Sequence, residues 1–423
     1  MGTEPFVARW PDGRQVPVRL QALGKSGGAG EVFSLADDAT LVAKLYHDSI
    51  QPEQLRQYER KIAWMMDHVP VLPPAGDRAE RIVQLAWPLA QVLRNGRFAG
   101  FLMEKVDFER TIELDYLLTH RQAEREGFAV DMGKLIAVCF NLASVLNSLH
   151  HSGIFVVDLK PVNIKVYKQA LYVAILDCDG FQITHREFQC DAPQVTPEYL
   201  APECQRGAVT QPRAQDCFAL ATIIFRLLNF GIHPYSGIAT GGHGLPVELA
   251  ARIRDRLFAY GTQAHPRIRP VPASAHLCLP PVLRQHFDSA FSADAAKRPT
   301  AGQWVDTLQF FARRDMGALV ACAQGHLHFP PLPCPMCLRG QLLQGHALRR
   351  QRFVARMQRS PARVARYVRN AIRGTQVSPF QAALAQAQWQ PVQVQASVLP
   401  LRQAFSVEIA WLAGLAVSIW WLL

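Results

Sequence analysis

The residues of this 423-residue chain best suited to chemistry are a glycine-rich loop and a few polar side chains that border apolar runs. The loop reads G-K-S-G-G-A-G-E-V at 24–32, and the polar set is Lys44, Asp158, Asn163 and Asp177. Because glycine has no Cβ atom, such a loop can lie close over phosphates and offer them backbone N–H groups. Phosphoryl transfer asks a protein mainly to hold phosphates and metal ions and to place a hydroxyl in line with phosphorus. These residue types meet those demands.

One stretch, V-T-P-E-Y-L-A-P-E at 195–203, resembles the end of a protein-kinase activation segment almost letter for letter. D-L-K-P-V-N at 158–163 and K-R-P-T-A at 297–301 stand around it in the order of the same family. The chain therefore resembles bacterial eukaryotic-type Ser/Thr protein kinases over about residues 18–312. The D-x-D-x-F-Q pattern starting at Asp177 gives a looser resemblance to a bacterial kinase-like group associated with tellurite resistance.

The resemblance implies an α+β fold, bilobal and protein-kinase-like. We expect residues 1–106 to form a strand-rich N-lobe and residues 107–315 a helical C-lobe. The spacing of apolar residues predicts strands at 16–23, 31–35, 40–46 and 101–103, and helices at 52–66, at 135–149, from Asp216 onward and at 299–314.

The resemblance also implies how ATP is held. Nucleotide-binding positions are matched by Gly24, Gly27, Gly30 and Val32 in the loop, by Met103 at the gate behind the adenine, and by Glu104 and Val106, whose backbone groups face the base. Gly24 stands one residue early. Either Lys25 takes the place of the first glycine or the turn holds an extra residue.

Lys44 matches the strand lysine that contacts the α- and β-phosphates and pairs with a glutamate on a helix. We expect that partner to be Glu59, because Glu59 and Ile62 fit the spacing of the family's helix. Glu53 is the alternative.

The catalytic loop carries the most direct match. Asp158 matches the aspartate that accepts the proton of the substrate hydroxyl, and Lys160 matches the lysine that neutralises the γ-phosphate. Asn163 and Asp177 are expected to hold Mg²⁺ or Mn²⁺. Asp179, two residues beyond Asp177, is the alternative metal ligand.

Two valines, Val156 and Val157, replace the His-Arg pair that usually precedes the catalytic aspartate. The missing Arg removes the usual docking group for a phosphate on the activation segment, so phosphorylation there is less expected as the on-switch. Together with the shifted glycines, these departures favour one alternative, a pseudokinase scaffold that binds nucleotide without phosphotransfer.

The segment that ends in A-P-E bears on the substrate. Thr196 favours Ser or Thr over Tyr as the acceptor in a protein substrate, and the complete segment counts against a kinase of small molecules. Glu203 with Arg298 resembles the ion pair that closes the large lobe, and Asp216 resembles the aspartate that anchors the catalytic loop.

A small Cys/His constellation follows the kinase-like part, at 316–340. Cys322, His326 or His328, Cys334 and Cys337 supply four ligands with a C-x2-C turn, which suits a closed, structural Zn²⁺ site of the zinc-knuckle kind. The alternative is a Pro-rich hinge with incidental thiols.

The end of the chain is basic and then hydrophobic. Residues 316–407 hold eleven Arg and no Lys, Asp or Glu, so the net charge of +11 belongs to this part. We expect an Arg-rich segment and linker at 341–404 and a hydrophobic helix at 405–423, where 19 residues span ~28 Å, near the thickness of a bilayer core.

Two interpretations of the basic segment stay open, a solvated linker and a contact with an anionic membrane surface. No nucleic-acid module is recognisable. Nine Cys without an N-terminal signal predict a kinase domain in the cytoplasm, tethered to the inner membrane by the terminal helix, with a buried helix as the alternative. The family resemblance also implies a cognate phosphatase.

Overall fold

The computed structural model describes residues 6–26, 28–76, 81–193, 195–241, 244–313 and 316–358. Contacts within the chain define one unit over residues 1–346 and a second over 347–423. The hydrophobic helix expected at 405–423, and the part of the expected linker beyond residue 358, lie outside the described residues.

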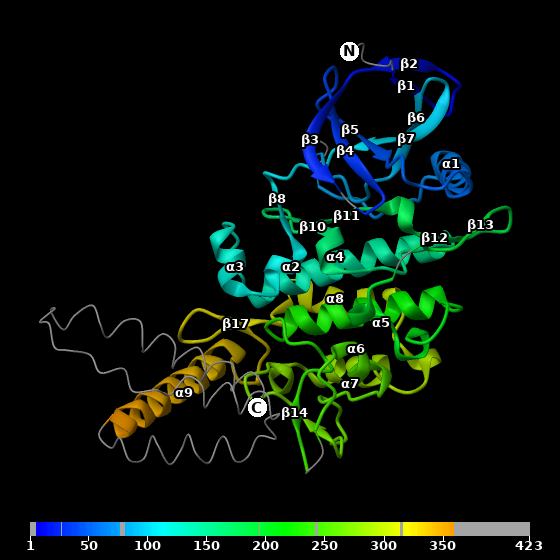
Figure 1. Cartoon of the computed structure of the whole chain (residues 1–423). Coiled ribbons are helices and arrows are strands. Elements are labelled where there is room, and N and C mark those ends of the chain that lie inside the picture. The colour runs from blue at the N-terminus through cyan, green and yellow to red at the C-terminus, as the bar shows by residue number, and fades with distance from the viewer. Residues whose placement is uncertain are drawn as a thin grey trace, which may run out of the picture. The chain divides into compact units, whose positions relative to one another are not determined.

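A seven-stranded antiparallel sheet forms the strand-rich lobe (Figure 1). Its apolar face is built by residues that alternate along the strands and pack into a small core of their own. The strand order is β2-β1-β6-β7-β5-β4-β3. The strands are β1 (Phe6–Arg9), β2 (Gln15–Val18), β3 (Leu20–Ser26), β4 (Gly30–Leu35), β5 (Leu41–Tyr46), β6 (Pro88–Arg94) and β7 (Arg97–Glu104).

Helix α1 (Pro52–Asp67) packs against the sheet, chiefly on β6 and β7. It begins with Pro52, which fits the first helical position because its missing N–H would have no partner there. Its buried side chains are Tyr58, Lys61, Ile62 and Met65. One face of α1 is therefore buried, and it includes a lysine and a tyrosine.

The helical lobe is organised around α4, which packs against α5 and α8 (Figure 1). Helix α4 begins after Asp131, whose side chain caps the N–H of Lys134, and α8 begins with a capping box formed by Thr300 and Gln303. The helices are α2 (Leu114–Leu117), α3 (His120–Arg125), α4 (Met132–His151), α5 (Pro212–Leu228), α6 (Leu249–Arg254), α7 (Pro281–Ala290) and α8 (Ala301–Ala312).

Two three-stranded sheets carry the loops that face the strand-rich lobe. Their orders are β11-β10-β8 and β13-β12-β9. The loop that holds Asp158 runs from β9 to β10, and the loop that holds Asp177 runs from β11 to β12. The strands are β8 (Thr111–Glu113), β9 (Ile154–Phe155), β10 (Ile164–Tyr167), β11 (Val173–Ile175), β12 (Gln182–Thr184) and β13 (Gln189–Cys190).

Two small two-stranded sheets and one more helix complete the described chain. The strands β14 (Ile238–Ala239) and β15 (Ile268–Arg269) pair across a long connection that contains α6, and β16 (Val320–Ala321) and β17 (Leu327–His328) form a hairpin. Helix α9 (Pro335–Gln358) follows this hairpin.

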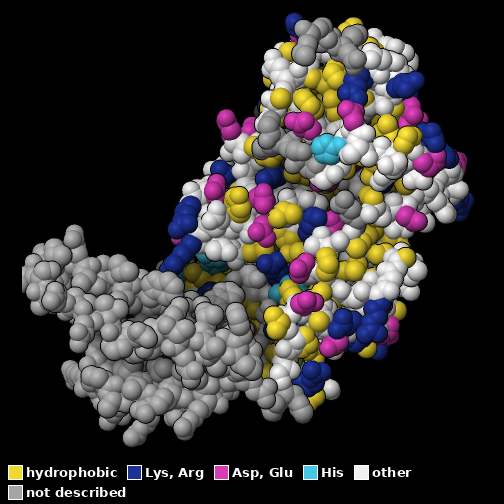
Figure 2. Space-filling model, viewed as in Figure 1, with side chains coloured by type: hydrophobic (Ala, Val, Ile, Leu, Met, Phe, Trp, Pro, Cys, Tyr) yellow, Lys and Arg dark blue, Asp and Glu magenta, His cyan; other side chains and the backbone are white. Residues whose placement is uncertain are grey.

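Among the described helices, α4 alone has the length and hydropathy of a membrane span, and 56% of that stretch is buried. Its apolar residues pack into the core of the helical lobe. On the face that Figure 2 shows, Asp and Glu side chains are interspersed with Lys and Arg over the described residues.

The expected helices and strands are found, with two shifts. Helix α5 begins at Pro212, four residues before Asp216, because proline fits the first turn of a helix. The strand expected at 16–23 is divided by Arg19 into β2 and β3. The elements that were not predicted include β1, β6 and α7.

Candidate active site

A cleft with a cavity volume of about 130 Å³ lies where the two lobes meet, and most of the expected functional residues line it. A larger hollow of about 450 Å³ beside Trp64 and His151 brings together no such set of residues. The cleft residues with polar side chains are Lys44, Tyr58, Asp158, Lys160, Asn163, Asp177 and Asp179, and Gly30 and Val32 cover them.

Lys44 is the centre of charge in this cleft. Its Nζ atom lies 2.7 and 3.0 Å from the two carboxylate oxygens of Asp179 and 3.3 Å from Oδ1 of Asp177. Burial alone would lower the pKa of Lys44, but the two carboxylates outweigh burial and raise the pKa above its usual value. Lys44 therefore stays an ammonium group that can face phosphates.

The expected pairing of Lys44 with Glu59 is absent from this structure. Glu59 forms an ion pair of 3.5 Å with Arg9, and the side chains of both are about 40% exposed. The alternative, Glu53, pairs with Arg56 on the same helix and is also exposed. The reason is the position of Glu59 around the helix. The buried face of α1 includes the neighbouring Tyr58 but not Glu59.

The glycine-rich loop contains a bulge. The register between β3 and β4 shifts between Ala22 and Lys25, so Gly24 lies in extra length on β3. Gly27 lies outside the described residues. A Cβ atom on Gly30 would collide with the carbonyl of Leu45, so glycine is required where β4 passes β5.

Val32 lies opposite Lys44 in the sheet, which fixes the loop above the lysine.

The end of β7 leads to the segment expected to meet the adenine. Met103 pairs with Val42 and Pro88 across the sheet, and Glu104 forms a partly exposed ion pair with Arg81. The side chain of Val106 is buried in a small apolar cluster. None of these three expected residues lines the cleft described above.

Asp158 and Lys160 line one edge of the cleft. Lys160 donates a hydrogen bond of 2.6 Å to Oδ2 of Asp158 and one of 3.1 Å to the hydroxyl of Thr196. Oδ1 of Asp158 is buried and has no hydrogen-bond partner among the described residues. One carboxylate oxygen is thus fixed by Lys160, and the other remains ready to accept a proton.

The catalytic loop is held by the buried Asp216. Its carboxylate accepts the backbone N–H groups of Val156 and Val157 at 2.8 and 2.7 Å, and it lies 2.9 Å from Nε2 of His150. Val157 has φ of 62°, a strained conformation for a β-branched residue. The hydrogen bonds to Asp216 keep the loop in this conformation just before Asp158.

Gln215 joins the catalytic loop to the activation segment, and the sequence analysis missed it. Its buried amide donates to the carbonyl groups of Val157 and Tyr199 at 3.1 and 2.9 Å. Its Oε1 accepts the N–H of Ala201 at 2.8 Å. The only sequence signal is its position next to Asp216.

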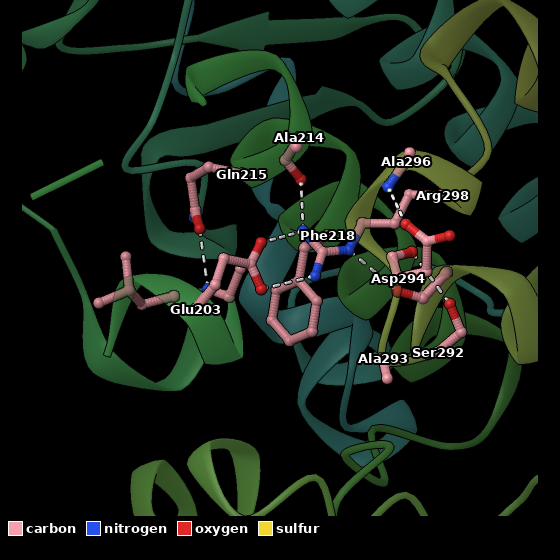
Figure 3. A network of polar contacts seen from close by, with 12 residues as sticks. Glu203, Ala214, Gln215, Phe218, Ser292, Ala293, Asp294, Ala296 and Arg298 are labelled. Atoms are coloured by element: carbon pink, nitrogen blue, oxygen red, sulfur yellow. Dashed lines mark hydrogen bonds and ion pairs between the residues drawn. The ribbon is translucent and has the colours of Figure 1, made fainter. Parts of the chain in front are cut away.

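The expected Glu203–Arg298 pair is present at the end of the activation segment. Figure 3 shows the guanidinium of Arg298 facing the carboxylate of Glu203, with both nitrogens of its fork engaged. Arg298 also donates to the carbonyl of Ala214 at 3.2 Å and lies over the ring of Phe218. Burial would raise the pKa of Glu203, but Arg298 lowers it below its usual value.

Asn163 and Asp177 line the same cleft from neighbouring loops. Asn163 ends a short 3₁₀ turn, and its carbonyl accepts the N–H of Leu176 at 2.8 Å, which ties the two loops together. The side chain of Asp177 is 60% exposed, whereas that of Asp179 is 3% exposed. Carboxylate and amide oxygens are the donors that Mg²⁺ prefers, so the open side chains of Asn163 and Asp177 fit such an ion.

A second cluster, outside the cleft, joins Cys322, His326, Cys334 and Cys337, whose ligand atoms lie within 4.8 Å of one another. Sulfur–sulfur and sulfur–Nδ1 separations within this cluster run from 3.5 to 3.8 Å. Tetrahedral zinc requires about 3.8 Å between sulfurs and about 3.5 Å between sulfur and nitrogen. The cluster therefore fits zinc, with His326 rather than His328 as the histidine ligand.

Comparisons with known proteins agree with this fold. The family model described as protein kinase domain matches residues 82–308. The chain is 31% identical over 331 residues to protein kinase YegI of Escherichia coli O157:H7, covering 74% of this chain and 48% of that protein. The YegI of strain K12 is 31% identical over the same length, covering 74% and 47%.

A third relative, Ser/Thr-protein kinase pkn3 of Myxococcus xanthus, is 24% identical over 299 residues, covering 66% of this chain and 48% of that protein. The chain belongs to the protein kinase domain family, in the eukaryotic-type form that these bacterial relatives carry. This confirms the expected α+β, two-lobed fold. The chain spans about half the length of the curated relatives it matches. The looser resemblance to the tellurite-resistance group stays untested.

Proposed function

We propose that this chain is an ATP- and Mg²⁺-dependent protein kinase that transfers the γ-phosphate to Ser or Thr of protein substrates or of itself. The observation that carries the proposal is the buried Oδ1 of Asp158, which no described residue hydrogen-bonds, beside Lys160 in a cleft that also holds Lys44. That oxygen accepts the proton of a hydroxyl placed against it. Bound Mg²⁺ neutralises charge on the transferring phosphate.

Each residue of the cleft has one task in this proposal. Lys44 holds the α- and β-phosphates, and Lys160 neutralises the γ-phosphate while it fixes Asp158. Asn163 and Asp177 hold the metal ion. The glycine-rich loop with Val32 covers the phosphates, and Met103, Glu104 and Val106 bound the adenine site.

Ser or Thr is proposed as the acceptor for two reasons. The hydroxyl of Thr196 lies 3.1 Å from Nζ of Lys160, so this part of the activation segment borders the site of transfer. The pkn3 relative is named a Ser/Thr-protein kinase. A pseudokinase scaffold is the alternative, and the strained Val157 in place of the usual arginine is the observation that favours it.

The experiment is autophosphorylation of the full chain with γ-labelled ATP and Mg²⁺, beside Asp158→Asn and the exposed control Asp255→Asn. We expect wild type and the control to incorporate phosphate on Ser or Thr, identified by phosphoamino-acid analysis. Asp158→Asn should bind nucleotide normally in a thermal-shift assay and incorporate none. Normal nucleotide binding by wild type without any transfer, to itself or to a general protein substrate, would establish the pseudokinase alternative.

We also propose a structural zinc ion at Cys322, His326, Cys334 and Cys337, supported by the separations of the four ligand atoms. Activity in the cytoplasm, a membrane tether at 405–423, contact of the Arg-rich segment with anionic lipid and a cognate phosphatase remain proposals from the sequence. Membrane fractionation of the full chain, compared with a chain ending at residue 404, tests the tether.

A further inference from the structure

The main partner of Lys44 in this cleft is Asp179, which the sequence offered only as an alternative metal ligand. Both carboxylate oxygens of Asp179 bond the ammonium of Lys44, at 2.7 and 3.0 Å, whereas Asp177 offers one oxygen at 3.3 Å. The side chain of Lys44 is 9% exposed and that of Asp179 is 3% exposed. Both oxygens of this buried carboxylate are therefore used in the ion pair with Lys44.

Asp179 also accepts a hydrogen bond from Tyr46, which is one of two stacked tyrosines. Tyr46 donates a hydrogen bond of 3.1 Å to Oδ2 of Asp179. The ring of Tyr46 stacks on Tyr58 of α1, with centroids 4.4 Å apart and an interplanar angle of 14°. One oxygen of Asp179 thus accepts from both Lys44 and Tyr46, which fixes the orientation of the carboxylate.

Helix α1 supports this arrangement without supplying a carboxylate. Its buried Lys61 donates to the carbonyl of Phe181, two residues beyond Asp179. Tyr58 is the residue of α1 that lines the cleft together with Lys44. Glu59 lies on the far side, where it pairs with Arg9, and its backbone carbonyl accepts from Gln91 at 3.0 Å.

The two aspartates of D-C-D differ in what they can reach. Asp177 is 60% exposed and faces the open cleft beside Asn163. Asp179 is enclosed by Lys44 and by Tyr46 of the stacked tyrosine pair, so a metal ion reaches it only by displacing the lysine. Asp177 therefore keeps one oxygen open toward the cleft, whereas both oxygens of Asp179 are already bonded to Lys44.

We infer that Asp179 takes the place of the helix glutamate and acts as the positioning residue that holds Lys44 for the phosphates. The inference rests on the proposed function, in which Lys44 contacts ATP. It assigns the metal to Asp177 and gives Glu59 no part in nucleotide binding. The partner of Lys44 then lies on the same loop as the metal ligand Asp177. Helix α1 contributes only through Tyr58 and Lys61.

The test uses the full chain and compares Asp179→Asn with the matched helix variant Glu59→Gln. Binding of ATP in EDTA and in Mg²⁺ is measured by calorimetry, and the KM for ATP is measured by autophosphorylation. Asp179→Asn should weaken binding about tenfold under both conditions and raise the KM for ATP by a similar factor. Glu59→Gln should change either value less than twofold, and the Mg²⁺ concentration for half-maximal rate should stay at the wild-type value in Asp179→Asn.

A double-mutant cycle with Lys44→Met shows whether Asp179 acts through the lysine. In the Lys44→Met background, Asp179→Asn should weaken ATP binding no further. Three results would each overturn the inference: wild-type affinity in folded Asp179→Asn, an additional loss in the double variant, or a tenfold loss from Glu59→Gln alone. A tenfold loss of ATP binding in Glu59→Gln would overturn the role of Asp179 even if Asp179→Asn does not fold.

The binding and transfer measurements separate this inference from the proposed function. Weakened ATP binding in Asp179→Asn together with no transfer by wild type would support the role of Asp179 and reject the kinase activity. Transfer by wild type together with unchanged ATP binding in Asp179→Asn would support the kinase activity and reject the role of Asp179.

Discussion

Oδ1 of Asp216 accepts a hydrogen bond of 2.7 Å from the backbone N–H of Val157, which has φ of 62°. Non-glycine residues avoid this conformation, and a branched Cβ makes it more costly. The second oxygen of Asp216 accepts the N–H of Val156 and meets His150. The buried aspartate thus offsets the strain that sets the direction of the catalytic loop.

Asp216→Asn tests this support. An amide has one acceptor oxygen instead of two, so a buried backbone N–H loses its partner, and we expect the free energy of unfolding to fall by about 3 kcal/mol. Urea unfolding of the full chain measures this, with the exposed Asp255→Asn as control. A variant as stable as wild type would show that other contacts hold Val157.

Glu203 predicts a pH dependence of stability. Burial raises and Arg298 lowers the pKa of Glu203, and the net folded-state pKa lies below the usual 4.5. Because a depressed carboxyl pKa stabilises the fold above the unfolded-state value, this contribution is complete at neutral pH. It is lost as the pH falls from 4.5 through the folded-state pKa.

Glu203→Gln should therefore lower the free energy of unfolding by about 1–2 kcal/mol at pH 7. The difference from wild type should shrink steadily below pH 4.5. Urea unfolding at several pH values measures both. A difference that stays constant down to pH 3.5 would mean that the charge of Glu203 contributes nothing to the pairing with Arg298.

The Cys/His cluster predicts a bound metal. The purified full chain should contain about one zinc ion per molecule, measured by elemental analysis. Cys337→Ser should lose the zinc and lower the melting temperature, whereas Cys190→Ser, a cysteine outside the cluster, should keep the metal. Zinc-free wild-type protein with the melting temperature of Cys337→Ser would reduce residues 316–340 to a hinge.

Much of the site was predictable because its residues are close together in the sequence. The loop from Asp158 to Asn163 and the segment that ends at Glu203 each carry their spacing within a few residues. In such a local pattern the sequence itself sets the order of the functional side chains along the loop, and this order does not depend on how the rest of the chain packs. The same is true of the C-x2-C turn at Cys334 and Cys337.

The partner of Lys44 was not predictable in this way. Glu59 and Ile62 are three residues apart and share a helix side, yet the buried face of α1 includes Ile62 and leaves Glu59 outside it. Asp179 reaches Lys44 across 135 residues of sequence. Only the packing of the two lobes brings them together, and the second aspartate of D-C-D was the sole hint.

Strand β6 was missed because its pattern is irregular. It begins with a proline and buries the polar Gln91, which accepts hydrogen bonds from Arg9 of β1. Alternation of apolar and polar residues is the main strand signal, and a buried glutamine removes it. The partner that satisfies Gln91 comes from a strand more than 80 residues earlier.

The most direct test of the account is the metal dependence of phosphotransfer. The rate of autophosphorylation by the full chain is titrated with Mn²⁺ at saturating ATP, for wild type, Asp177→Asn and Asp179→Asn. We predict that wild type transfers phosphate, that Asp177→Asn needs at least about tenfold more Mn²⁺ for half-maximal rate, and that Asp179→Asn keeps the wild-type requirement. Wild-type metal dependence in Asp177→Asn, with the requirement raised in Asp179→Asn instead, would contradict the assignment of the metal to Asp177 and of Lys44 to Asp179.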